Sequence, residues 1–115
     1  MKTAAPSNWH TIIDARSRDL HAIIAGKIRL HPSVLGQVCK TLARWLRAMD
    51  ETDRGRDALV EWQLRVNDQP LDEVLEFMAS EDEEACRLRQ SSPFMGLLTE
   101  QERQDVFRKY EAFRS

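Results

Sequence analysis

The chain of 115 residues is 42% hydrophobic and 31% charged with a formal net charge of −2, a composition that favours one globular domain, residues 1–115, over a disordered segment. No apolar run approaches the roughly 18 residues that cross a bilayer. Residues 1–10 lack the apolar core of a secretory signal, so we expect a cytoplasmic protein. The slightly negative charge also argues against a dedicated nucleic-acid-binding domain, which is usually basic.

The first predicted helix covers about residues 8–28, with Ser7 or Asn8 as its N-cap. The His31–Pro32 step disfavours helical backbone at His31, so the chain should turn there. Apolar residues recur at three- and four-residue steps and fall on one arc of this helix: Trp9, Ile12, Ile13, Leu20, Ile23, Ile24 and Ile28.

A second helix is predicted over residues 32–49, because Pro32 suits the first turn of a helix. Its apolar residues follow a 3-4-3-4 spacing that is typical of a seam between helices, and we expect this helix to be the central element of the fold. The same spacing allows the seam to close between two chains, as a homodimer. The seam consists of Leu35, Val38, Leu42, Trp45 and Met49.

Four shorter helices are predicted in the second half of the chain, over about residues 56–66, 70–78, 80–90 and 99–113. Ser80 with Glu83 and Thr99 with Glu102 each match a capping box, in which the two residues bond each other's backbone N–H at a helix start. No segment alternates as a strand does. The sequence therefore predicts an all-α fold, a compact irregular bundle of five to six helices.

Charge is strongly partitioned along the chain. Residues 1–49 carry eight basic and two acidic side chains, residues 50–85 carry three and thirteen, and residues 86–115 carry six and four, which gives +6, −10 and +2. The basic helices can lie against the acidic ones, or they can present a basic face to an acidic partner or a polyanion.

No catalytic or metal-binding group of residues is evident in the sequence. His10 and His21 lie too far apart along one helix to share a metal ion, and His31 precedes a proline in a turn. Ser91 and Ser92 have no histidine nearby in the sequence. We expect no cofactor, no metal and no enzymatic activity, and we expect the two cysteines, Cys39 and Cys86, to be unpaired thiols.

Several basic side chains are candidates for function or for internal pairing. Arg16 and Lys27 project within the apolar arc of the first helix, where pairing with an acidic residue of the middle segment is the favoured interpretation. On the second helix, a basic stripe opposite the seam is either a solvated face or a contact for phosphate or acidic protein. This basic stripe consists of Lys40, Arg44 and Arg47. A helix-turn-helix over residues 70–90 is disfavoured because its second helix begins with four carboxylates, which repel DNA phosphates.

The C-terminal half contains Trp62, the run Pro70-Leu71-Asp72-Glu73-Val74-Leu75, and the run Arg87-Leu88-Arg89-Gln90-Ser91-Ser92-Pro93-Phe94-Met95-Gly96-Leu97-Leu98-Thr99, closing on Glu102-Arg103. Over residues 44–110 the chain resembles small all-helical bacterial proteins of toxin–antitoxin and defence-type loci that carry an LRQ-SPF-G-L-ER segment. The resemblance implies an antitoxin-like protein. Some similar chains carry a separate N-terminal DNA-binding helix-turn-helix, which has no counterpart here.

The second of these runs also has a physical interpretation of its own. Basic side chains beside an apolar knob form a plausible interaction hot spot, because arginine and aromatic residues carry much of the energy of protein interfaces. The alternative is that Phe94 packs over the core and that Arg87 or Arg89 pairs with Glu83, Glu84 or Glu102. The predicted partner-binding residues are Arg87, Arg89, Gln90, Pro93, Phe94 and Met95.

The sequence thus favours a protein-interaction module that neutralises or regulates a partner protein by direct binding. The partner is expected to be encoded by a neighbouring gene. The alternative is a nucleic-acid-binding transcriptional regulator that uses the basic stripe, Lys40, Arg44 and Arg47.

Overall fold

The computed structural model describes residues 9–111, which form six α-helices and two short 3₁₀ turns and contain no strand. The all-α prediction is therefore confirmed. Ser7, Asn8 and Phe113 lie outside the described residues. The elements are α1 (Trp9–Leu30), η1 (Pro32–Val34), α2 (Leu35–Ala48), α3 (Arg56–Asp68), α4 (Leu71–Met78), α5 (Glu83–Arg89), η2 (Met95–Leu97) and α6 (Glu100–Glu111).

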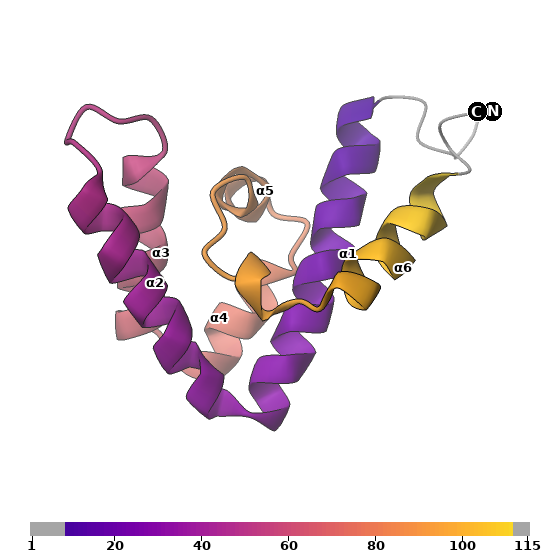
Figure 1. The fold of residues 1–115 in the computed structure, drawn as a ribbon, viewed down its shortest axis with the longest axis horizontal. Helices are drawn as coiled ribbons and strands as arrows, with labels where there is room; N and C mark the ends of the chain where they lie inside the picture. Colours follow the sequence, from indigo (N-terminus) through magenta and orange to yellow (C-terminus); the bar gives the residue numbers. More distant parts are fainter. Residues whose placement is uncertain (1–8, 112–115) are drawn as a thin grey trace.

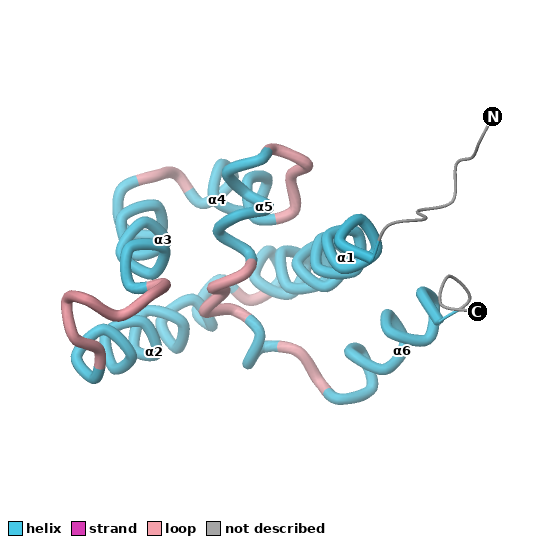
Figure 2. The backbone as a smooth tube through the Cα atoms, turned by 90° about the horizontal axis from the view of Figure 1, so that it is seen from above, coloured by secondary structure: helices cyan, strands magenta, loops and turns pink. Residues whose placement is uncertain are grey.

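The helices form two arms with a filled centre (Figure 1). α2 packs on α3 in one arm, α1 packs on α6 in the other, and α4 and α5 lie between the arms in contact with both α1 and α3. Seen from above, the same two pairs flank α4 and α5 (Figure 2). None of the described helices combines the length and the apolar character needed to span a membrane.

The central helix is α1, and the prediction that the second helix is central is wrong. The apolar arc of α1 meets η1, α4, α5, η2 and α6, whereas α2 packs mainly on α3 and η1. Only Val38 and Leu42 of the α2 seam are fully buried. The buried residues of α1 are Ile12, Leu20, His21, Ile24, Ala25 and Ile28.

The starts of the helices follow local side-chain chemistry. Thr99 and Glu102 form the predicted capping box, since each side chain accepts a hydrogen bond from the other's backbone N–H, at 2.8 and 3.1 Å. The box predicted at Ser80 is wrong. Asp82 caps α5 instead by accepting from the N–H of Glu84, and Ser80 accepts from the N–H of Asp82.

Two aromatic residues fill the space between the arms. Trp62 of α3 and Phe94 of the α5–η2 loop are both 0% exposed, and their rings meet edge to face with centroids 5.0 Å apart. The indole N–H of Trp62 donates to the carbonyl of Leu88 at 2.8 Å, which satisfies its buried polar atom. Phe94 therefore packs in the core.

We expect the Phe94→Ala substitution to lower the free energy of unfolding by about 3–5 kcal/mol, because it removes a fully buried aromatic ring. Urea unfolding followed by circular dichroism measures this loss. Gln90→Ala, at an exposed position four residues earlier, is the control and should change stability by less than about 0.5 kcal/mol. Equal stability of the two variants would contradict the packing role of Phe94.

Candidate functional site

Two adjoining hollows at α3 and α4 are lined by several charged side chains. One, of about 390 Å³, is lined by Arg65, Gln69, Glu73, Glu76, Phe77 and Ser80. The other, of about 300 Å³, is lined by Glu61, Leu64, Arg65, Asp68 and Gln69. Because Arg65 and Gln69 line both, we treat the two hollows as one site and call it the α3–α4 trough.

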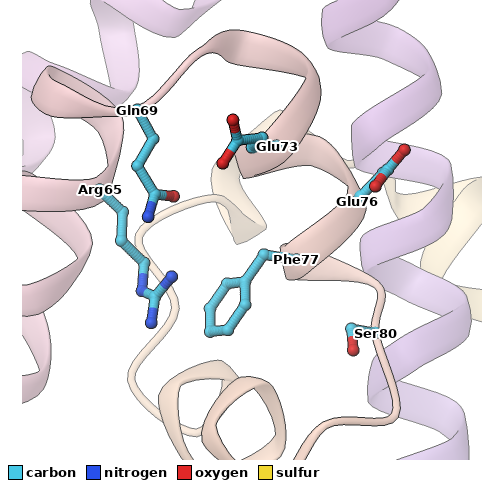
Figure 3. A pocket seen from close by; sticks show the side chains of 6 residues that line it. All are labelled: Arg65, Gln69, Glu73, Glu76, Phe77 and Ser80. Carbon is cyan, nitrogen blue, oxygen red and sulfur yellow. The ribbon is translucent and has the colours of Figure 1, made fainter.

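Helical spacing brings these side chains together. Arg65 of α3 and Gln69, the C-cap of that helix, are four residues apart and lie on one side of it. Glu73 and Phe77 are four residues apart on α4 and share one face of that helix. Figure 3 shows the four side chains converging from the two helices, with Ser80 on the far side of the hollow. The arrangement depends on the contact between α3 and α4.

At the middle of the trough, the Arg65 guanidinium lies over the ring of Phe77 with its carbon 3.7 Å from the ring centroid (Figure 3). This cation–π contact holds the side chain in one place. The Phe77 ring also packs edge to face with Trp62, with centroids 5.7 Å apart. The floor of the trough is thus continuous with the buried core.

Carboxylates dominate the rim. Glu61 accepts from Arg87 at 2.9 Å, whereas Asp68, Glu73 and Glu76 form no ion pair with any described residue. Beside them Leu64 is 54% exposed. The trough therefore offers an apolar contact and an aromatic floor inside a mostly negative rim.

The lining of the trough consists of carboxylate, guanidinium, amide, hydroxyl and apolar side chains. It contains no histidine, cysteine or paired nucleophile and base, and among residues 9–111 no group of three or more His, Cys, Asp or Glu side chains is arranged to hold a metal ion. Carboxylates beside an exposed leucine suit a cationic, partly apolar ligand.

The predicted partner-binding residues divide between core and surface. Arg87 is exposed and pairs with Glu61 and Glu84, hydrogen bonds that raise the pKa of its guanidinium, Glu61 contributing most. Through Glu61 it borders the trough. Gln90 is exposed and Met95 is half-buried.

Arg89, Pro93 and Phe94 are buried, so the expectation that they form a surface knob is wrong. Arg89 is 5% exposed and donates to the carbonyls of Met78 and Ser80, at 3.1 and 2.7 Å, and burial lowers the pKa of its guanidinium. These bonds tie α5 to the end of α4. The structure agrees with the packing alternative, because Phe94 lies in the core and Arg87, rather than Arg89, pairs with Glu84.

The basic stripe is exposed along its length. Lys40, Arg44 and Arg47 lie on the outward face of α2, and none of them forms an ion pair with a described residue. The N-terminal and acidic middle segments are joined by one ion pair in the described part of the chain, between Arg18 and Glu81 at 3.2 Å. The partitioned charges are therefore largely left on the surface.

Lys27 pairs with the C-terminal segment, and not with the middle segment as expected. Lys27 donates to Glu102 of α6 at 2.6 Å and to the carbonyl of Leu97 at 2.8 Å. The Arg16 guanidinium lies 4.5 Å from the ring centroid of Phe107, also on α6. Both side chains thus fasten α1 to the C-terminal segment.

The two cysteines are unpaired, as predicted, and half-buried.

The structure brings together one pair that the sequence separates by 71 residues. His21 is 1% exposed, its Nδ1 lies 2.7 Å from the carbonyl of Ser17, and its Nε2 lies 2.7 Å from Ser92 Oγ. A proton on Nδ1 satisfies both contacts, since Nε2 then accepts the Ser92 hydroxyl. Burial lowers the pKa of His21 to about 4, so the ring is a weak base at neutral pH. The pair holds the α5–η2 loop against α1.

Sequence patterns alone did not single out Leu64, Arg65 or the outer edge of Phe77. The available signal was charge: the stretch with a net charge of −10 includes the whole of α3 and α4.

Comparisons with known proteins return no family model, no curated protein and no solved structure that matches this chain.

We expect stability to fall on mild acidification because of His21. Its folded pKa of about 4 lies below the ordinary value of 6.5, so protons bind the unfolded chain more tightly and stability is lost as the pH falls through this range. The free energy of unfolding should drop by about 2 kcal/mol between pH 7.5 and pH 5. Urea titrations at each pH measure it.

The control for this experiment is His21→Gln, which lacks the titrating ring. It should be less stable than the original protein at pH 7.5 but should show little change between pH 7.5 and pH 5. A free energy of unfolding that stays constant over this range in the original protein would contradict a buried neutral His21.

Proposed function

We propose that this protein is a protein-interaction module that binds a partner protein through the α3–α4 trough and thereby neutralises or regulates it. The observation that carries the proposal is the joining of two hollows at Arg65 and Gln69, beside the exposed Leu64 and three rim carboxylates that lack ion pairs among residues 9–111. Apolar contact inside a polar rim is the usual anatomy of a protein interface.

The charge of the trough defines the partner. Asp68, Glu73 and Glu76 are free to pair with lysine or arginine, and a partner that supplies both a basic and an apolar side chain matches the whole site. Electrostatic attraction of this kind speeds association and selects against acidic partners.

Neutralisation of a partner is the antitoxin-like part of the proposal, and it rests on the resemblance of residues 44–110 to small bacterial proteins of toxin–antitoxin and defence-type loci. In this proposal the module acts in the bacterial cytoplasm on the product of a neighbouring gene, and its binding covers a basic functional surface of that product. The nucleic-acid alternative rests on the basic stripe of α2.

The experiment co-expresses the chain with the product of the adjacent gene and measures their affinity by calorimetry. We expect Leu64→Arg and Glu73→Lys each to weaken binding at least tenfold, about 1.4 kcal/mol, because one removes the apolar contact and both add charge repulsion. If the partner inhibits growth, the same variants should fail to protect the cells.

Glu51→Lys is the matched control, because it makes the same charge change at an exposed position of the α2–α3 loop, outside the trough. It should bind within twofold of the original protein. Absence of binding by the original protein, or equal binding by Leu64→Arg, Glu73→Lys and Glu51→Lys, would refute the proposal.

A further inference from the structure

Arg89 is a buried cation that has no anionic partner among the described residues. It is 5% exposed, and none of the ion pairs in residues 9–111 includes it. Its Nη1 donates to the backbone carbonyls of Met78 and Ser80, at 3.1 and 2.7 Å. A buried charge without a counter-charge is costly, so a neighbouring group that can become an anion gains stability by doing so.

The thiol of Cys86, one helical turn earlier on α5, lies against this charge. Nη2 of Arg89 donates to Cys86 Sγ at 3.2 Å. Nε lies on the same edge of the guanidinium and is buried with no hydrogen-bond partner in the part of the chain that the structure describes. This edge is one that binds an oxyanion in bidentate fashion. Arg89 thus presents an unused N–H donor beside the sulfur.

The charges around the pair favour a negative sulfur. Burial lowers the pKa of the Arg89 guanidinium, and the interaction with Cys86 is the largest that raises it again. From α1, Asp14 also raises this pKa and Arg18 lowers it, while Arg18 pairs with Glu81 at 3.2 Å. An arginine beside a thiol favours the thiolate, which is the nucleophilic form of cysteine.

Cys86 is also open to small reagents, because it is half-buried. Its Sγ donates to the carbonyl of Glu81 at 3.8 Å, a long contact that leaves the sulfur loosely held. Cys39 of α2 is half-buried too, but no described guanidinium donates to its sulfur. The chain therefore contains a matched pair of thiols, of which one lies beside an arginine.

We propose that Cys86 is a site of oxidation by small peroxides and that Arg89 holds the product, a cysteine sulfenate. The thiolate sulfur attacks one oxygen of hydrogen peroxide, so that an S–O bond forms, the O–O bond breaks and hydroxide leaves. The hydroxide takes the proton of the new sulfenic acid and becomes water. Sulfur loses two electrons and the peroxide gains them. The sulfenate oxygen then accepts from Nη2 and Nε of Arg89, which gives the buried Nε–H a partner.

The test uses two single-cysteine proteins. Cys39→Ser retains Cys86, and Cys86→Ser retains Cys39. Each is treated with hydrogen peroxide in the presence of dimedone, which traps sulfenic acid, and the adduct is followed by mass spectrometry. We expect Cys86 to react at least about fivefold faster in the folded protein than in the same chain unfolded in urea. Cys39 should react more slowly when folded, because burial limits access to it.

This comparison separates activation from exposure. Unfolding increases the access of peroxide to both thiols, so a faster reaction in the folded state requires a group that activates the sulfur. The proposal is overturned if folded Cys86 reacts no faster than unfolded Cys86.

Arg89→Met in the Cys39→Ser protein identifies the activating group. Its reaction should slow to the rate of the unfolded chain, whereas Arg87→Met, the same change at an exposed position of α5, should alter the rate less than twofold. Circular dichroism verifies that the variants fold, and a folded Arg89→Met that reacts like the original protein also overturns the proposal. If Arg89→Met does not fold, the comparison of folded and unfolded Cys86 decides. No partner protein takes part, so the outcome is independent of the α3–α4 trough.

Discussion

The burial of Trp62 fixes the position of the α3–α4 trough, because its indole contacts three parts of the fold. Its N–H bonds the carbonyl of Leu88 at 2.8 Å, and its ring meets Phe77 on one side and Phe94 on the other. Phe94 in turn lies edge to face with His21, whose Nε2 reaches Ser92. These ring contacts run through the core from Phe77, at the floor of the α3–α4 trough, to His21 and the α5–η2 loop.

The basic and acidic segments of the sequence remain separate charged regions on the surface, because few of their opposite charges meet. Lys27 and Lys109 pair with Glu102 and Asp19, contacts that join α1 to α6. The acidic stretch of α3 and α4 and the basic stripe of α2 contribute almost nothing to such pairs. A pair on the surface gains little energy in water, so folding does not require these charges to be matched. They remain available to partners.

The sequence could not decide the role of the segment from Arg87 to Met95, for a physical reason. Apolar residues in a loop next to a proline can lie exposed on the surface or packed in the core, since no periodicity marks the buried side. The structure buries Phe94 at 0% exposure and bonds one guanidinium nitrogen of Arg89 to backbone carbonyls instead of carboxylates. The capping boxes show a similar limit: Thr99 and Glu102 match the pattern, whereas at Ser80 the better-placed Asp82 caps the helix.

By itself, the sequence determined the helical class, the approximate extents of the helices and the segregation of charge, because each depends on neighbours within a few turns. Tertiary structure alone decided that α1 is central, that Phe94 is core, and that Leu64, Arg65 and Phe77 share a trough. It also placed His21 beside Ser92, 71 residues away. These features depend on which helix faces meet, and an amphipathic pattern shows that a face is buried without showing what covers it.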